Sequence, residues 1–262
     1  MLSFFNKRFF IIFLFPLILG GLAVLSFQPF NFFFLNFLSL PLLFYLIIYV
    51  KKKSKSVYRK KPYKKNLFIL SSAFGFGFYL SGIHWINYSL TFDDSFKILI
   101  PFGLFLVPLF LSIFFSFAVL IVGPLLNFNL SSILLFSGSL AFSDYLRAKI
   151  LTGFPWNIWA YSFSWATEIL QILNKTGLFT FNLIAITIFM LPAALFLKIN
   201  FVKKSLILIS LLLIVFILYI YGNHSINQNK DYLNSQKEKF YIKIVSPNLK
   251  LKYGLDSNEI FI

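Results

Sequence analysis

The sequence predicts an all-α polytopic membrane bundle of about seven transmembrane helices, followed by the beginning of a soluble domain. Three observations support this fold class. Hydrophobic residues make up 59% of the 262 residues and charged residues 12%, whereas soluble domains average roughly 45–50% and 25%. The apolar residues gather into runs of about 20, the length at which a helix crosses a bilayer. Lys and Arg gather in short segments between these runs, as in the cytoplasmic loops of membrane proteins.

Seven apolar segments are candidates for membrane-spanning helices. The first follows Lys7 and Arg8, as a signal peptide would. It is long, however, and lacks a small-residue cleavage site, so we expect it to be retained. Pro29 separates the first two segments and favours a tight turn, while Lys175 and Pro192 interrupt the sixth. The expected spans are 9–27, 31–50, 66–88, 97–122, 131–150, 168–197 and 205–222.

Three basic segments predict the orientation of the bundle: 1–8, 51–65 and 198–204. Segment 51–65 alone holds nine of the 24 Lys and Arg residues. A path that alternates across the membrane places all three on one side, which the positive-inside rule makes cytoplasmic. The N-terminus is therefore expected in the cytoplasm. The opposite side would receive the remaining loops and the tail: 89–96, 151–167 and the residues from 223 onward.

Charge and residue types exclude several other kinds of site. The net charge is +16, but it is concentrated beside apolar spans and no nucleic-acid motif accompanies it, so membrane lipids rather than nucleic acid are the expected partners. The chain has no Cys and only two His, His84 and His224, which are far apart. We therefore expect no metal site, no cofactor and no thiolate nucleophile within these residues.

The composition changes after Gly222. Residues 223–239 are polar and are interpreted as a linker or stalk, and residues 240–245 (FYIKIV) alternate in the manner of a β-strand. We therefore divide the chain into a transmembrane domain, 1–222, and a second part, 223–262, that holds a linker and the incomplete start of a soluble domain.

Asp144, Arg147 and Lys149 interrupt the fifth apolar span near its outer end. Ionisable groups at membrane depth are costly and persist when they are paired or needed. One interpretation is an ion pair, since residues three apart share a helical face, with Lys149 reaching toward the interface. The other is that Arg147 faces a phospholipid headgroup or another phosphate-bearing substrate.

Two further segments stand out. Gly153-Phe154-Pro155-Trp156 cannot continue a helix and predicts a turn or re-entrant loop at the outer interface. The Trp and Tyr residues around it are typical either of an interfacial aromatic belt or of a binding site. In the third span, Gly75, Gly77 and Gly82 predict close helix packing. These segments are FGFGFYLSGIHWIN (74–87) and GFPWNIWAYSFSW (153–165).

Several ordered blocks together resemble the bacterial apolipoprotein N-acyltransferase family. The most specific is FSDYLRAKILTGFPWNIWAYS, which resembles the family's acidic-x-x-x-Arg helix followed by Thr-Gly-Phe-Pro-Trp. The other blocks are FQPFNFFFLNFLSLPLLF, FGFGFYLSGIHWINYSL, LQILNKTGLFTFNLI and YIKIVSPNLKLKYGL, the last resembling the first strand of the family's nitrilase-like domain.

The resemblance implies a membrane platform in the bacterial inner membrane, with a periplasmic tail that begins an α/β nitrilase-like domain. It implies transfer of an acyl chain from a phospholipid, through a Cys thiolate, to the N-terminal diacylglyceryl-cysteine of an apolipoprotein. The family's Glu, Lys and Cys would lie beyond Ile262. The residues carried over as substrate contacts are Arg147, Gly153, Phe154, Pro155, Trp156, Asn157 and Tyr161.

Two alternatives to an enzyme remain. One is a catalytically inactive, lipid-binding membrane scaffold without a nitrilase-like domain. The other is a transporter or channel, which would place charges through mid-helix positions and break helices at the midplane. Here the charges of the fifth span cluster at one edge, which favours the acyltransferase over a transporter.

Overall fold

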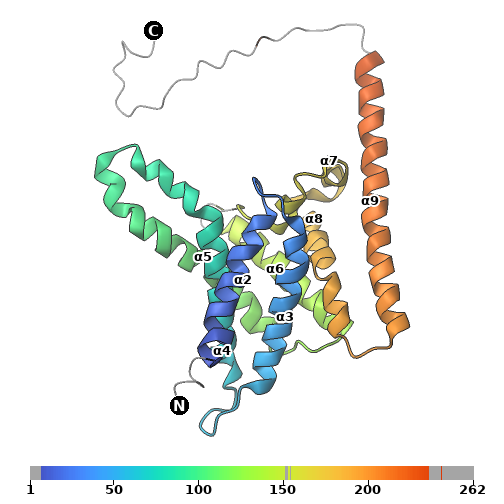
Figure 1. Ribbon diagram of the computed structural model, residues 1–262. Coiled ribbons are helices and arrows are strands. Elements are labelled where there is room, and N and C mark those ends of the chain that lie inside the picture. Colours follow the sequence, from blue (N-terminus) through green and yellow to red (C-terminus); the bar gives the residue numbers. More distant parts are fainter. Residues whose placement is uncertain (1–6, 151–152, 154, 236–242, 244–262) are drawn as a thin grey trace.

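The computed structural model describes residues 7–150, 153, 155–235 and 243, and every regular element within them is a helix (Figure 1). The α-helices are α2 (Phe15–Ala23), α3 (Asn36–Lys53), α4 (Tyr63–Ile83), α5 (Ile100–Val122), α6 (Leu130–Lys149), α7 (Thr167–Leu170), α8 (Leu173–Phe189) and α9 (Phe201–Ser235). A π-helical turn, η1 (Phe10–Leu14), and six 3₁₀ segments extend or join them: η2 (Val24–Ser26), η3 (Phe33–Leu35), η4 (His84–Thr91), η5 (Asp94–Leu99), η6 (Trp159–Phe163) and η7 (Leu191–Phe196).

Five helical segments of the described chain are long and apolar enough to cross a membrane: Lys7–Ser26, Phe33–Lys53, Tyr63–Thr91, Asp94–Val122 and Phe201–Ser235. They correspond to the first four and the seventh of the predicted spans. The fifth predicted span, 131–150, forms the 20-residue helix α6. This helix does not reach the same apolar character, because it carries serines and the charged residues noted above. The multi-pass bundle is therefore confirmed, but the count of seven spans is not.

The sixth predicted span, 168–197, is wrong as a single helix. The chain forms the short α7, then α8, and then the 3₁₀ segment η7. Gly177 has a φ of 73° and a ψ of 168°, so the backbone leaves the helical region inside α8. Pro192 lies at the start of η7, where its missing N–H costs no helical hydrogen bond. The broken path gives a helix of only 17 residues, Leu173–Phe189.

Helix α9 differs from the predicted seventh span in length. It continues through Ser235, so residues 223–235 of the predicted linker or stalk are helical. Figure 1 shows α9 beside the bundle, standing higher than its neighbours. The predicted strand at 240–245 lies outside the described residues except for Lys243, and the second domain remains a prediction.

Helix α4 forms the centre of the packing, with contacts to α2, α3 and α5. Gly77 faces α2 so closely that a Cβ there would lie 2.1 Å from the backbone oxygen of Leu17, and a Cβ on Gly20 would lie 2.1 Å from that of Phe74. The predicted role of α4 glycines in close helix packing is therefore confirmed. Near the end of these helices, Phe27 and Phe78 pack against Trp159, with ring centroids 6.3 and 4.8 Å away.

The bundle has a basic end and an aromatic end. The start of η1, the α3–α4 loop and the start of α9 lie at the same end in Figure 1, as the sequence predicts. Arg8 donates a 3.0 Å hydrogen bond to Asn66 across this end, and Lys51 donates one of 3.1 Å to the carbonyl of Pro124. At the other end the loop that contains Trp156 meets the end of α4. Which end faces the cytoplasm remains a prediction.

Candidate functional site

The charged residues of α6 form a buried ion pair. Arg147 Nη2 lies 3.1 Å from Asp144 Oδ1, and Arg147 is only 2% exposed. The guanidinium also lies over the ring of Tyr79 from α4, 5.2 Å from its centroid. An ion pair was one of the two interpretations of these residues, and the structure contains it. Because the guanidinium is buried, it interacts with Asp144 and Tyr79 inside the bundle and is poorly placed to contact a ligand at the surface.

Asn182 of α8 completes the network. Its Nδ2 donates a 2.9 Å hydrogen bond to Asp144 Oδ2, and its Oδ1 accepts one of 3.0 Å from the backbone N–H of Ala160. Both oxygens of Asp144 are therefore held, one by Arg147 and one by Asn182. Asn182 is fully buried, and the sequence analysis missed it. The available signal was a lone Asn in an apolar segment, since a buried amide needs partners.

The buried network also contacts the loop that follows α6, through Trp156. Arg147 Nη1 donates a 2.7 Å hydrogen bond to the backbone carbonyl of Trp156. Two residues of the loop have positive φ, 85° at Gly153 and 52° at Asn157, a region that Gly and Asn occupy more easily than other residues. The predicted turn after α6 is therefore present, and its shape depends on both its own residues and Arg147.

A cavity of about 420 Å³ lies beside this loop, lined by Trp85, Ile86, Tyr88, Ser89, Phe92 and Trp156. The rings of Trp85 and Trp156 meet at 68°, with centroids 5.1 Å apart. Segment η4 supplies one wall and the loop supplies the other. The indole N–H of Trp85 donates to the carbonyl of Gly82 at 3.1 Å, and the Ser89 hydroxyl donates to that of Ile86 at 2.8 Å. The cavity therefore offers mainly apolar surface, which suits the apolar part of an amphiphile at a membrane interface.

The structure brings most of the predicted contact residues to this end of the bundle. Pro155 and Trp156 are exposed, Gly153 and Asn157 are half-buried, and Arg147 is buried. Tyr161 is 37% exposed. Burial raises the pKa of its phenol, which Arg147 partly opposes, so the group is a hydrogen-bond donor at neutral pH. Phe154 lies outside the described residues.

Within the described ranges, no group of three or more His, Cys, Asp or Glu side chains is arranged to hold a metal ion. The site offers aromatic surface, the phenol of Tyr161 and a loop fixed by a buried charge network. Such an arrangement can bind and orient a substrate.

Gly82 sets the distance between α4 and the loop. A Cβ at this position would lie 1.7 Å from Asn157 Nδ2. We expect Gly82→Ala to displace the Asn157 amide and cost about 1 kcal/mol of stability, the lower range for an overpacked contact. Acrylamide quenching of tryptophan emission should rise as the loop moves. Asn157→Gly removes the amide that the added methyl group would meet, and glycine tolerates the positive φ. The double variant Gly82→Ala with Asn157→Gly should therefore show the same quenching as Asn157→Gly alone. Equal quenching in Gly82→Ala and the unchanged protein would contradict this contact.

Comparison with known proteins assigns the chain to a family. Residues 19–191 match the family model described as apolipoprotein N-acyltransferase N-terminal domain. The chain is 32% identical over 179 residues to the apolipoprotein N-acyltransferase of Brucella melitensis. The aligned region covers 67% of this chain and 33% of the relative. It is 30% identical over 248 residues to that of Rickettsia prowazekii, covering 94% of this chain and 46% of the relative.

The chain thus spans between a third and a half of the length of these curated relatives. The matched region contains α6, the loop and α8, which hold the buried network and the aromatic cavity wall. A match over this extent shows common ancestry for the membrane bundle. The chain belongs to the apolipoprotein N-acyltransferase family, through that family's N-terminal domain.

Proposed function

We propose that this chain forms the membrane part of a phospholipid:apolipoprotein N-acyltransferase in a bacterial inner membrane. In this proposal the donor is a phospholipid and the acceptor is the N-terminal diacylglyceryl-cysteine of a lipoprotein. The N-terminus lies in the cytoplasm and the aromatic end faces the periplasm. The observation that carries the proposal is the cavity between Trp85 and Trp156, beside a loop fixed by a buried ion pair.

The predicted contact residues take two roles in this proposal. Trp156 and Tyr161 present exposed aromatic and hydroxyl groups, while Gly153, Pro155 and Asn157 shape the loop that carries Trp156. Phe154 remains a predicted substrate contact. Arg147 positions this loop through the Trp156 carbonyl. The sequence suggested that Arg147 contacts a lipid phosphate directly. The burial of its side chain favours the positioning role instead.

The chemistry of acyl transfer through a thioester needs a thiolate nucleophile, a base and an oxyanion donor. This chain has no Cys, and Asp144 is engaged by Arg147 and Asn182. We therefore propose that these residues bind and orient lipid, and that the family's Glu, Lys and Cys act from a nitrilase-like part outside residues 1–262. The chain by itself should not acylate a diacylated lipopeptide.

The proposal is tested with a phospholipid that carries a photoreactive group in its acyl chain. Purified protein in nanodiscs is irradiated, and the labelled peptides are identified by mass spectrometry. We expect labelling of the peptides that contain Trp85 and Trp156, and a loss of about fivefold in Trp156→Ala, since the indole supplies much of the cavity wall.

Trp165→Ala is a matched control. Trp85, Trp156 and Trp165 are 49%, 48% and 47% exposed, but Trp165 packs on Phe33 and does not line the cavity. Its replacement should leave labelling unchanged. If Trp156→Ala and Trp165→Ala lost the same amount of labelling, the tryptophans would act only as a general interfacial belt. That result would overturn the proposed site. Labelling at the cavity without N-acylation in a protein of the relatives' full length would instead favour a lipid-binding scaffold.

A further inference from the structure

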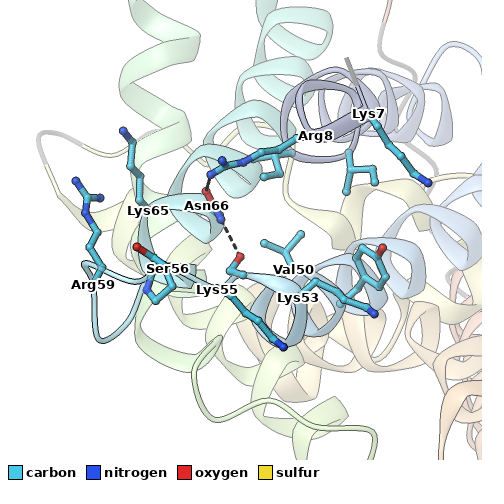
Figure 2. A pocket seen from close by; sticks show the side chains of 14 residues that line it. Lys7, Arg8, Val50, Lys53, Lys55, Ser56, Arg59, Lys65 and Asn66 are labelled. Carbon is cyan, nitrogen blue, oxygen red and sulfur yellow. Dashed lines mark hydrogen bonds between the residues drawn. The ribbon is translucent and has the colours of Figure 1, made fainter. Parts of the chain in front are cut away.

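A second cavity, of about 670 Å³, opens at the basic end of the bundle, far from the aromatic site (Figure 2). Its walls come from η1, the end of α3, the loop after it and the start of α4. Six cationic side chains line it: Lys7, Arg8, Lys53, Lys55, Arg59 and Lys65. Four of these cations belong to the basic segment 51–65, and Lys7 and Arg8 come from the N-terminal segment, so the fold brings two basic segments together at one cavity.

No carboxylate balances these charges. The described lining of the cavity contains no Asp or Glu, and none occurs in the first 92 residues of the sequence. Cations that share one concave surface repel one another, and the low-dielectric walls strengthen the field they create. Binding of an anion would relieve this repulsion.

One cation of the cavity is held in place. Arg8 Nη2 donates a 3.0 Å hydrogen bond to Asn66 Oδ1, and Asn66 Nδ2 donates one of 2.7 Å to Ser54 Oγ. Figure 2 shows the Arg8 guanidinium and the Asn66 amide meeting at the cavity. Asn66 is buried, so its amide orientation is fixed by the two partners. Because Ser54 Oγ accepts from Asn66, its own hydroxyl proton remains available to an acceptor in the cavity.

The rest of the lining is apolar. Ile12 and Val50 are almost fully buried, and Ile11 and Tyr49 lie beside them in the same wall. A free inorganic anion would gain nothing from this surface. A phosphate attached to a glyceride would place its charge among the cations and its apolar part along the helices, and basic pockets between membrane helices bind lipid headgroups in this way.

We propose that this cavity binds the phosphate group of an anionic phospholipid. Arg8 and Ser54 donate hydrogen bonds to the phosphate oxygens, and the surrounding lysines supply the remaining charge. The positive-inside rule explains why cations occur in short loops. It does not require that these cations line one cavity, or that the buried Asn66 holds Arg8 there. The two explanations differ in what single substitutions should do.

The test uses the whole chain in phosphatidylcholine nanodiscs, titrated with dioctanoyl phosphatidic acid and followed by native mass spectrometry. We expect saturable binding of one lipid per chain. Arg8→Gln should weaken binding about tenfold, since it removes a charge-assisted hydrogen bond. Ser54→Ala, which keeps every charge and changes one hydroxyl, should weaken it about threefold. Lys60 and Lys61 are exposed in the same loop but do not line the cavity, so Lys60→Gln and Lys61→Gln are the matched controls and should change binding little.

Three results would overturn the proposal. Equal weakening by Arg8→Gln and the two control variants would reduce binding to general attraction by the basic surface. Binding that fails to saturate near one lipid per chain would exclude a defined site. Inorganic phosphate that displaces the lipid at equal concentration would show that the apolar wall contributes nothing, which removes the case for a phospholipid.

Discussion

Replacing Arg147 with methionine should destabilise the bundle by about 3–5 kcal/mol, the usual cost of leaving one charge of a buried pair without its partner. Asp144 would keep Asn182 but lose its cation, and the Trp156 carbonyl would lose its guanidinium donor. The measurement is unfolding by sodium dodecyl sulfate in mixed micelles, followed by tryptophan emission. All four tryptophans of the chain, Trp85, Trp156, Trp159 and Trp165, lie at the aromatic end, so the signal reports directly on this site.

Two controls separate the network from general effects of charge. Lys149→Met removes a cation two residues along α6 from an exposed position and should cost less than about 0.5 kcal/mol, as surface changes usually do. The double variant Asp144→Leu with Arg147→Met removes both charges and should be more stable than Arg147→Met alone. If the double variant were the less stable of the two, the stability of this region would not depend on the pairing of the two charges.

Gly77→Ala should lower stability by about 1–3 kcal/mol, the range for an overpacked core position. The added Cβ would lie 2.1 Å from the backbone oxygen of Leu17, and a backbone atom cannot move aside as a side-chain tip can. Helices α2 and α4 must therefore separate, which disturbs Phe78 and the ring of Trp159 that stacks on it. The same detergent titration measures the loss, and a change in tryptophan emission should accompany it.

Gly138→Ala provides the matched control on α6. A Cβ on Gly138 meets nothing within 4 Å among the described residues, so this variant should be neutral or gain up to about 1 kcal/mol from helix propensity. The difference between the two variants isolates the α2–α4 contact from the general effect of replacing a helical glycine. Equal stability in both would mean that the helices can move apart without loss.

The sequence predicts local features of this molecule better than long-range ones. The Asp144–Arg147 pair follows from the helical period, and the turn at Gly153 and Pro155 follows from backbone preferences. Asn182 could not be placed, because its partners are 22 and 38 residues away and meet only in the folded bundle. The basic cavity was missed for the same reason, since Arg8 and Asn66 are 58 residues apart.

The two errors in helix prediction have physical causes. Hydropathy averaged over 168–197 conceals Gly177, whose single left-handed φ is enough to break the helix. Residues 223–235 look like a linker because they are polar, but they contain neither Gly nor Pro. A helix that is already nucleated in the apolar part of α9 extends through such residues at little cost. Composition therefore did not reveal that the helix continues beyond Gly222.

The continuation of α9 has a mechanical consequence. Thirteen helical residues after Gly222, at 1.5 Å each, form a stiff post about 20 Å tall above the last apolar turn. A flexible tether of the same length would let whatever follows Ser235 rest against the bilayer or swing away from it. The helix instead fixes Ser235 at a set height above the last apolar turn of α9.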